Sequence, residues 1–261
     1  MSRGTRVRRE AIVQLATTTG LASVEELSAR FGVTASTIRR DLAQLEADGQ
    51  LARTYGGVMP LVAHPEASLR QRLGEAFEAK RAIATWAAAR VGTGETVLLD
   101  SGSTTGALAH ELRESRDLTV ATTGLTALQE LVNAEHVRVE CLGGTLRHLS
   151  QGFVGPLAEE ALRRMTFDRV FLGADAVTAE DGICEATLEQ TRLKEAMAGR
   201  SDRVYVLVHA AKLGRRPFHA WARMPERWTL VTDSGADESA LSPFTAAGVE
   251  VVAVNPDGTE S

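Results

Sequence analysis

Short polar and cationic side chains gather in residues 34–57, on a stretch that also has the periodicity of a helix. Ile38, Leu42 and Leu45 recur at spacings of four and three, so they share one helical face and leave the polar residues outside. Hydroxyl, amide and guanidinium groups presented in this way can bond phosphates and base edges in a DNA groove. The predicted DNA-contacting residues are Thr34, Ser36, Thr37, Arg39, Arg40 and Gln44 on the helix, and Arg53 on the short strand after it.

An isolated amphipathic helix with arginines on its outer face is more often a solvated surface helix. The neighbouring residues are therefore needed to distinguish a DNA-contacting helix from a surface helix. Residues 8–18 offer the apolar side of one helix, and Ser23-Val24-Glu25-Glu26 fits a capping box that begins a second. Gly32 leaves only a tight turn before the third helix, and a ribbon is predicted over residues 51–57. This order of elements is typical of a winged helix-turn-helix, which we assign to residues 1–57.

The net charge of −5 conceals an uneven distribution along the chain. Residues 1–57 hold 8 Arg against 6 Asp and Glu, a balance of +2, whereas residues 58–261 hold 21 Lys and Arg against 28 Asp and Glu, a balance of −7. A positive first segment suits contact with DNA. Four arginines near the N-terminus could extend it as a basic arm, although we favour a frayed, solvated tail. They are Arg3, Arg6, Arg8 and Arg9.

A second group of chemically useful residues follows the predicted strand at residues 96–100. There the chain reads Asp100-Ser101-Gly102-Ser103-Thr104-Thr105 and enters a helix. Backbone N–H groups at a helix N-terminus, with glycine permitting close approach and hydroxyls nearby, can cradle a phosphate. A well-capped helix without a ligand fits this loop equally well. The GK[ST] ending of a nucleotide-binding P-loop is missing.

Apolar strand candidates alternate with helical segments through the rest of the chain, which predicts a mostly parallel α/β sheet. The strands are predicted at 96–100, 118–122, 137–142, 169–173, 204–208, 228–232 and 249–254, and the helices at 78–90, 104–114, 125–133, 156–165, 188–200 and 238–247. We assign residues 58–75, which contain Pro60 and Pro65, to a linker, and residues 76–261 to an α/β effector-binding domain.

Ligands of such sheets bind beyond the carboxyl ends of the strands, so the loops there are the candidate site. Lysine usage singles out one loop, since only Lys80, Lys194 and Lys212 among 29 cationic residues are lysine. The predicted effector-binding residues are Asp100, Ser101, Gly102, Ser103, Thr104, Thr105, Thr123, Gly143, Gly144, Gly152, Asp175, Glu185 and Lys212. Together they offer the hydroxyl, carboxylate and ammonium groups that a phosphorylated, polyhydroxylated ligand needs.

Two cysteines, Cys141 and Cys184, are too few and too far apart for a metal motif or a disulfide framework. No apolar run is long enough to span a bilayer, and the basic N-terminus lacks the apolar core of a signal peptide. We therefore expect a cytoplasmic protein without membrane partners. No metal site, cofactor or catalytic residue is predicted.

The chain resembles the DeoR family (DeoR/GlpR-type) of bacterial transcriptional regulators over nearly its whole length. The resemblance in the first segment lies in Val24-Glu25-Glu26-Leu27, Phe31-Gly32-Val33-Thr34, Thr37-Ile38-Arg39-Arg40-Asp41-Leu42, Leu45-Glu46 and Tyr55-Gly56-Gly57-Val58. In the second part it lies in Lys80, Ile83-Ala84, the Asp100–Thr105 run, Val120, Thr122-Thr123, Leu142-Gly143-Gly144, Gly152, Gly155, Gly173-Ala174-Asp175, Gly182, Lys194 and Lys212.

This resemblance implies a sensor domain similar in fold to ribose-5-phosphate isomerase. It also implies a repressor of a sugar-metabolism operon that a phosphorylated sugar or related metabolite releases from operator DNA. Symmetric assemblies read repeated half-sites, so we expect a homodimer or homotetramer. Two departures concern the effector: His209-Ala210-Ala211-Lys212-Leu213 replaces the family's Asp-Ser-Ser-Lys-Phe, and Gly124 replaces its common asparagine. The effector chemistry at this edge is therefore expected to differ.

The alternative is an enzyme, a sugar-phosphate isomerase that carries an added DNA-binding head. Asp175 could then be the base that moves a proton between adjacent carbons, with Lys212 stabilising the enediolate. However, the isomerase pattern has a second aspartate where this chain has Leu172, and its glycine-rich segment after a lysine is missing. We therefore favour the regulator.

Overall fold

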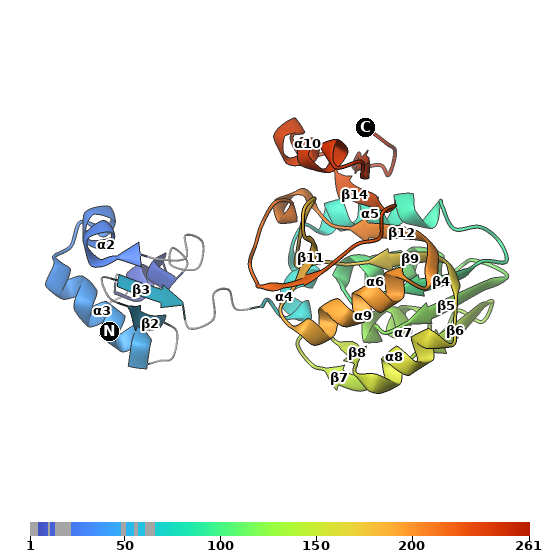
Figure 1. Cartoon of the computed structure of the whole chain (residues 1–261), viewed down its shortest axis with the longest axis horizontal. Coiled ribbons are helices and arrows are strands. Elements are labelled where there is room, and N and C mark those ends of the chain that lie inside the picture. The colour runs from blue at the N-terminus through green and yellow to red at the C-terminus, as the bar shows by residue number, and fades with distance from the viewer. Residues whose placement is uncertain (1–4, 10, 14–21, 48–50, 55–56, 61–65) are drawn as a thin grey trace. The chain divides into compact units, whose positions relative to one another are not determined.

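The computed structural model describes residues 5–9, 11–13, 22–47, 51–54, 57–60 and 66–261, and the chain divides into two compact units, Met1–Glu66 and Ala67–Ser261 (Figure 1). Several residues used in the sequence analysis lie outside this description, namely Arg3, Tyr55, Gly56 and the end of the first predicted helix at 14–18.

Unit 1 is a small helical bundle with a three-stranded antiparallel sheet. Residues 5–9 and 11–13 are helical, and the sheet has the order β1-β3-β2. The named elements are β1 (Ala22–Ser23), α2 (Val24–Phe31), α3 (Ala35–Ala47), β2 (Leu51–Thr54) and β3 (Gly57–Pro60). The β2–β3 hairpin is the predicted ribbon, and the arrangement confirms a winged helix-turn-helix.

Local chemistry sets the ends of α2. The Ser23 hydroxyl accepts from the Glu26 N–H at 3.1 Å while the Glu26 carboxylate accepts from the Ser23 N–H at 3.0 Å, which is the predicted capping box. At the other end Gly32 has φ 61°, a left-handed conformation that glycine adopts without steric cost. The tight turn that separates α2 from α3 follows from this glycine.

The two helices pack through the predicted apolar face. Ile38, Leu42 and Leu45 from α3 are buried against Leu27 of α2 and Ile12 of the first helical segment. Each fully buried aliphatic side chain contributes roughly 1.5–3 kcal/mol to folding. Burial of these side chains is therefore the main stabilising contribution to unit 1.

Unit 2 is built on a seven-stranded sheet with the order β15-β14-β12-β9-β4-β5-β6, in which every pairing is parallel. These strands are the seven that the sequence predicts: β4 (Thr96–Leu99), β5 (Leu118–Thr122), β6 (Val137–Cys141), β9 (Phe167–Leu172), β12 (Ser201–Leu207), β14 (Thr229–Asp233) and β15 (Glu250–Val254). The predicted mostly parallel α/β class is therefore confirmed.

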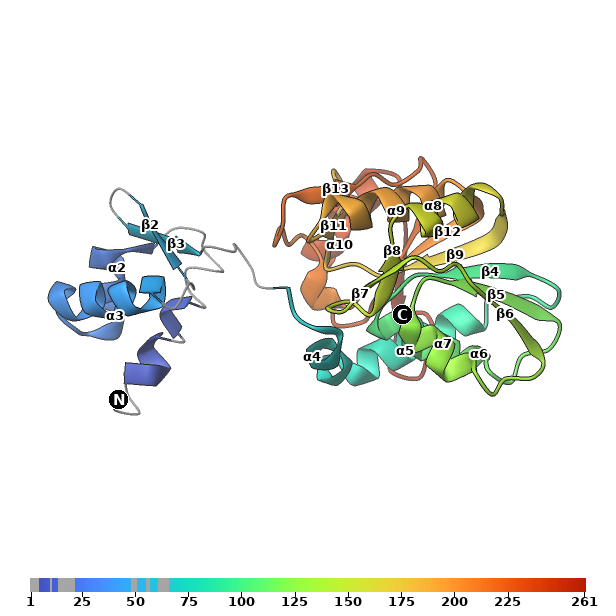
Figure 2. The same cartoon turned by 90° about the horizontal axis from the view of Figure 1, so that it is seen from below.

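Helices cover both faces of this sheet, as Figure 2 shows. Leu98 and Val170 point into the core beneath α8 (Pro156–Arg163), α9 (Leu188–Ala198) and α10 (Glu238–Ala246). Their neighbours Val97 and Phe171 point the other way, towards α5 (Phe77–Ala88), α6 (Ser103–Leu112) and α7 (Leu125–Leu131). Because successive strand residues alternate between faces, strands that are apolar at every position are buried on both sides.

Five short antiparallel strands were not predicted. They form a sheet of order β10-β11-β13 and a β7–β8 hairpin: β7 (Thr145–Arg147), β8 (Gly152–Val154), β10 (Ala176–Thr178), β11 (Gly182–Glu185) and β13 (Ala220–Ala222). Strands of three or four residues next to glycines are too short to show a period of two.

The segment predicted as linker, residues 58–75, also holds regular structure. It contains the end of β3 and the helix α4 (Leu69–Gly74), which begins with a capping box between Ser68 and Gln71. Leu69 is buried, and its N–H donates to the Leu149 carbonyl at 2.8 Å, so α4 is docked on unit 2. Among the described residues no helix is both long and apolar enough to cross a membrane.

Candidate DNA-binding helix and effector cleft

The α3 helix presents its predicted DNA-contacting residues on the outside of unit 1. Thr34, Ser36, Arg39, Arg40 and Gln44 are exposed, and Thr37 is half-buried. The Thr34 hydroxyl accepts from the Thr37 N–H at 3.3 Å and also bonds the Ser36 hydroxyl. Thr34 therefore caps the N-terminus of α3 and holds neighbouring hydroxyls together. Arg53 lies on β2, and its side chain is outside the described part of the structure.

Two arginines that we assigned to a solvated tail have a structural partner instead. The Arg8 and Arg9 guanidinium groups donate to the two Asp41 oxygens at 2.7 and 2.8 Å, and Asp41 is buried. This pairing fixes the first helical segment against α3. The expectation of a frayed tail was thus wrong for Arg8 and Arg9, because a buried carboxylate requires cationic partners.

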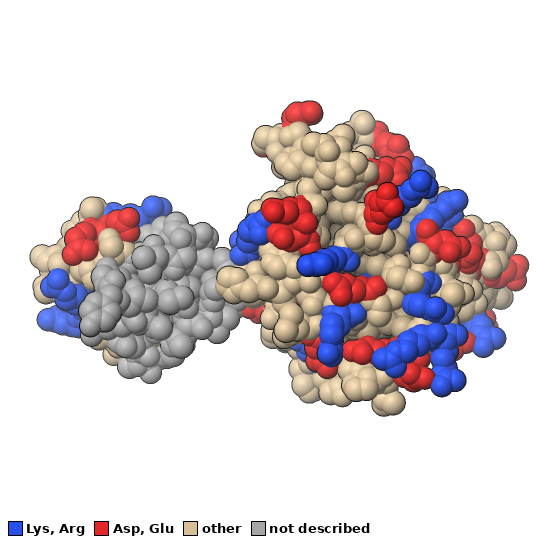
Figure 3. All heavy atoms as spheres, viewed as in Figure 1, with Lys and Arg blue, Asp and Glu red and all other residues tan. Residues whose placement is uncertain are grey.

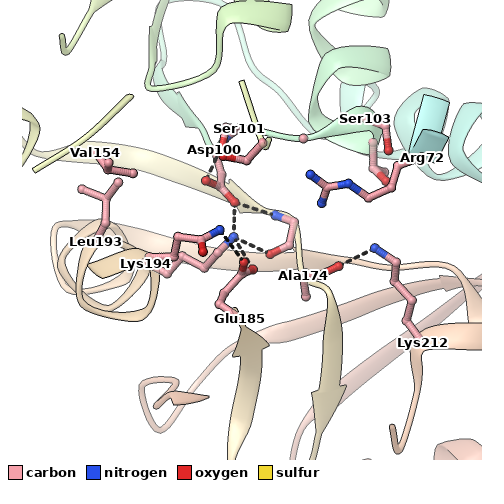
Figure 4. Close-up of a pocket in the computed structure, with 15 residues that line it drawn as sticks. Arg72, Asp100, Ser101, Ser103, Val154, Ala174, Glu185, Leu193, Lys194 and Lys212 are labelled. Carbon is pink, nitrogen blue, oxygen red and sulfur yellow. Dashed lines mark hydrogen bonds and ion pairs between the residues drawn. The ribbon is translucent and has the colours of Figure 1, made fainter. Parts of the chain in front are cut away.

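The candidate effector site is a cleft at the carboxyl ends of β4 and β9. These adjacent strands form the switch point of the sheet, since β5 and β6 follow β4 on one side and β12, β14 and β15 follow β9 on the other. Crevices at such points are the usual ligand sites of open α/β sheets. The cleft is lined by Arg72, Asp100, Ser101, Gly102, Ser103, Thr104, Ser150, Val154, Gly173, Ala174, Glu185, Gln190, Leu193, Lys194 and Lys212 (Figure 4).

Asp100 ties the two strand ends together. One carboxylate oxygen accepts from the Ser101 N–H at 2.7 Å, and the other accepts from the Gly173 N–H at 3.1 Å and from the Lys194 ammonium. Because its oxygens are used by the protein, Asp100 shapes the floor of the cleft more than it offers free acceptors.

Lys194 and Glu185 form a buried ionic pair beside this floor. The Lys194 ammonium lies 3.1 Å from the Glu185 carboxylate and donates to the Gly173 carbonyl at 2.8 Å, while Gln190 donates to Glu185 at 2.9 Å. Burial acts to lower the pKa of Lys194, but Asp100 and Glu185 outweigh it and raise that pKa. Burial raises the pKa of Glu185 in spite of the opposing Lys194 ammonium. Perturbed ionisable groups of this kind cluster at functional sites.

Cationic groups surround the other end of the cleft. Lys212 donates to the Ala174 carbonyl, and the Lys80 ammonium donates to the carbonyl of Arg72. Burial and the nearby Lys212 lower the pKa of Lys80 to about 8. Burial, Lys212 and Lys80 together lower the pKa of His209 to about 4, so this ring is neutral near pH 7. Repulsion between Lys80 and Lys212 favours the arrival of an anion.

Seven of the thirteen predicted effector residues line the cleft, namely Asp100, Ser101, Gly102, Ser103, Thr104, Glu185 and Lys212. Thr105 is fully buried and donates back to the Gly102 carbonyl at 3.3 Å, and Thr123 is also fully buried. Asp175 sits behind the lining, 3.1 Å from Arg72.

The three remaining predicted residues, Gly143, Gly144 and Gly152, meet needs of the backbone. Gly143 has φ +69°, and at Gly144 (φ +119°) an added Cβ would lie 2.5 Å from the Val154 carbonyl oxygen. At Gly152 an added Cβ would lie 2.4 Å from the Ser101 hydroxyl. Glycine is therefore favoured at Gly143 by the left-handed backbone, and at Gly144 and Gly152 by the close approach of neighbouring atoms.

Sequence reasoning missed four polar residues of the lining: Arg72, Ser150, Gln190 and Lys194. Lys194 had a signal in its rarity as a lysine, but it was not assigned to the site. Arg72 lies in a segment with two prolines that suggested a linker. Ser150 belongs to a loop, residues 150–155, that was expected on the ligand rim, but Ser150 itself was not assigned to the site, and Gln190 had no distinguishing feature in the chain.

Taken together, a winged helix-turn-helix and an α/β unit with a polar cleft define a DNA-binding regulator with a sensor domain. Residues 8–61 match the DeoR-like helix-turn-helix domain, and residues 75–234 match the DeoR C terminal sensor domain. The chain belongs to the DeoR family of transcriptional regulators.

Named relatives extend over nearly the whole chain. It is 35% identical to the putative aga operon transcriptional repressor of Escherichia coli O157:H7, covering 96% of this chain and 94% of the relative. It is 35% identical to the HTH-type transcriptional regulator GlpR of Haloferax volcanii, covering 94% and 96%. It is 30% identical to the lactose phosphotransferase system repressor of Streptococcus mutans, covering 91% and 96%. These relatives are regulators, and the chain is a transcriptional regulator and not an isomerase.

Solved structures resemble the chain only weakly. Ribose 5-phosphate isomerase A from Methanocaldococcus jannaschii is 19% identical, with a TM-score of 0.38 over 51% of this chain and 52% of that one. The translation initiation factor eIF-2B from Pyrococcus horikoshii OT3 is 16% identical, with a TM-score of 0.40 over 84% and 74%. Similarity at this level carries no functional argument.

Proposed function

We propose that this protein represses a sugar-metabolism operon in the cytoplasm and leaves its operator when a phosphorylated sugar, or a related metabolite, binds the cleft. The observation that carries this proposal is that Arg72 and Lys212 line the cleft together with Ser103 and Thr104 at the N-terminus of α6. A phosphate there would meet cationic donors, the hydroxyls of the Ser101–Thr104 loop and the positive end of a helix dipole. The aga operon repressor and the lactose phosphotransferase system repressor among the relatives of this chain support a sugar-linked operon.

The two ends of the cleft suggest two roles in recognition. The phosphate would lie at the end formed by Arg72 and Lys212, where positive charge is in excess. The hydroxyl groups of a sugar would lie towards Glu185 and Gln190, which offer carboxylate and amide groups. Hydrogen-bonding groups buried in this way discriminate strongly, because a ligand that lacks their partner leaves them unpaired.

On the DNA side, Arg39, Arg40 and Gln44 would read base edges from α3, while Thr34, Ser36, Thr37 and Arg53 would contact the backbone. Two such heads on a homodimer or homotetramer would read repeated half-sites, each contributing part of the affinity. An effector can release the operator only if it binds the DNA-free conformation more tightly than the DNA-bound one.

Displacement of operator DNA tests this proposal. Promoter fragments recovered by chromatin pull-down would be labelled and bound to the full chain. Phosphorylated sugars and their unphosphorylated counterparts would then be screened for release of the label. We expect release by a phosphorylated compound and none by its unphosphorylated counterpart. Equal release by both would contradict a phosphate-binding cleft.

A further inference from the structure

The α4 helix closes the mouth of the cleft through one side chain. Arg72 extends from α4 into the space between the Ser101–Ser103 loop and Ala174 (Figure 4). Its Nη1 donates to the Asp175 carboxylate at 3.1 Å, with side-chain exposures of 12% and 9%. The backbone carbonyl of the same arginine accepts from Lys80. Arg72 therefore fastens α4 to two elements of the sensor unit.

This contact leaves hydrogen-bonding capacity unused. Among the described residues, Nε and Nη2 of Arg72 and the second oxygen of Asp175 are buried without a partner. Buried donors without acceptors are costly, and they are rare in folded proteins. A guanidinium with two free donors on a cleft wall matches the bidentate geometry of a phosphate.

The cleft is also narrow in this arrangement of its lining. It has about 30 Å³ of space for solvent, which is enough for one or two water molecules. A phosphorylated sugar can enter only if part of the lining moves. The floor formed by Asp100, Gly173 and Lys194 is held by several mutual bonds, whereas the guanidinium group of Arg72 is held by one hydrogen-bonded contact, to Asp175.

We propose that the effector phosphate takes Arg72 away from Asp175 and that α4 moves with it. This inference rests on the proposed function, because it assumes a phosphate in the cleft. The chain passes from unit 1 into unit 2 between Glu66 and Ala67, and α4 begins at Leu69. A shift of α4 therefore acts directly on the segment that leads to the DNA-binding unit, and effector occupancy reaches that unit along a short covalent path.

Asp175 could either position Arg72 for the phosphate or compete with the phosphate for it, and the two roles predict opposite changes in phosphate affinity when Asp175 loses its charge. If Asp175 held Arg72 in place for the phosphate, removing its charge would weaken phosphate binding. If the phosphate and Asp175 compete for Arg72, removing that charge strengthens phosphate binding. The sign of the Asp175→Asn effect decides between the two.

Titration calorimetry on the full chain measures this sign, with inorganic phosphate and D-ribose 5-phosphate as probes. We expect Asp175→Asn to tighten binding by about fivefold or more and Arg72→Met to weaken it by about tenfold. In the Arg72→Met background, the gain in phosphate affinity from Asp175→Asn should fall to about twofold or less, because the guanidinium for which Asp175 and the phosphate compete is gone. Asp202→Asn, an exposed aspartate on β12, is the matched control and should leave affinity unchanged.

Hydrogen exchange on the wild-type chain gives a second measurement that needs no variant. Phosphate should change the exchange of the amides at residues 67–75, including that of Leu69, which bonds Leu149. If neither Lys212→Ala nor Arg72→Met changed the affinity for the phosphate probes, the proposed function would be overturned and this inference with it. Suppose instead that Lys212→Ala weakens binding of the probes. If Asp175→Asn then leaves phosphate affinity unchanged or weaker, or if phosphate does not alter hydrogen exchange in α4, only the proposed movement of Arg72 is overturned.

Discussion

At the scale of single residues, the sensor unit uses its few lysines where a compact ammonium can meet a carbonyl or a carboxylate. Lys194 lies in a buried network with Asp100 and Glu185, and its charge is compensated there. Lys212 donates to a backbone carbonyl, and its pKa is lowered by burial although Asp175 opposes that change. Lys212 is therefore the better candidate to receive an anionic ligand.

Replacing Lys212 with alanine should weaken induction and leave operator binding intact. A lost charge-assisted hydrogen bond costs roughly 1.5–3 kcal/mol, so the effector concentration for half release should rise by at least about tenfold. The measurement is a gel-shift titration with effector at fixed salt. Arg215→Ala, which removes an exposed cation three residues further on, is the control and should behave as wild type. An unchanged midpoint for Lys212→Ala would exclude it from the site.

His209 predicts a pH dependence of stability. Its folded-state pKa of about 4 lies below the ordinary histidine value of 6.5, because burial, Lys212, Lys80 and Arg215 lower it, with Asp233 opposing them. Between these two values the unfolded chain binds a proton that the folded chain does not. The part of the unfolding free energy that depends on neutral His209 is therefore fully present above pH 6.5 and is lost as pH falls towards 4.

The variant His209→Gln removes this titration. From pH 7 to pH 5 it should lose about 1–2 kcal/mol less of its unfolding free energy than wild type does, after allowance for partial exposure of the ring. Urea denaturation at the two pH values measures the difference. Equal losses in both proteins would show that His209 does not carry the effect.

At the scale of elements, α3 combines an anchored inner face with an outer face that is open to DNA. Ile38, Leu42 and Leu45 hold it in the core, and the buried Asp41 locks it to Arg8 and Arg9. An element that must reach base edges needs this rigidity, since a helix that rocks cannot keep its side chains in register with a groove.

Replacing Arg39 and Arg40 together with alanine should abolish most operator affinity. Each good base contact is worth about 1–3 kcal/mol, so we expect a loss of tenfold or more at fixed salt while the fold persists. Gel shift measures affinity, and circular dichroism checks the fold. The matched control is Arg163→Ala with Arg164→Ala, an adjacent exposed pair on α8 that contacts Glu160. If the α3 variant retained its operator affinity, α3 would be ruled out as the helix that contacts the operator bases.

At the scale of the whole molecule, the net charge differs in sign between the two ends of the chain, +2 over residues 1–57 and −7 over residues 58–261. Unit 2 carries net negative charge, and the face of it seen in Figure 3 has cations and anions interspersed. A surface of mixed sign does not attract a polyanion along its length. The α/β unit is thus suited to sensing, and we expect DNA affinity to come from unit 1.

Assembly therefore has a predicted outcome. The chain has a mass of 27.9 kDa, and we expect two or four copies in solution, binding a DNA with two half-sites far more tightly than one with a single half-site. Sedimentation measures the mass, and gel shift with one-site and two-site DNA measures the gain. A monomer that binds both DNAs equally would contradict cooperative reading by paired heads.

The sequence by itself determined the repeating elements of this protein. The spacing of Ile38, Leu42 and Leu45 marked the inner face of α3, and seven apolar runs marked the seven parallel strands. The Ser23 capping box and the Gly32 turn were equally legible. These features depend on neighbours within a few residues, because the pitch of a helix and the pleat of a strand are local properties.

Only the tertiary structure decided which residues meet in the cleft. Arg72 contacts Asp175 across 103 positions, and Lys194 contacts Asp100 across 94. Neither pair has a local signature, because the order of strands in the sheet brings the ends of β4 and β9 together. The same distinction separates Ser103, which lines the cleft, from Thr105, which the turn of α6 points into the protein. Periodicity depends on local backbone geometry, whereas a site depends on how distant strand ends converge.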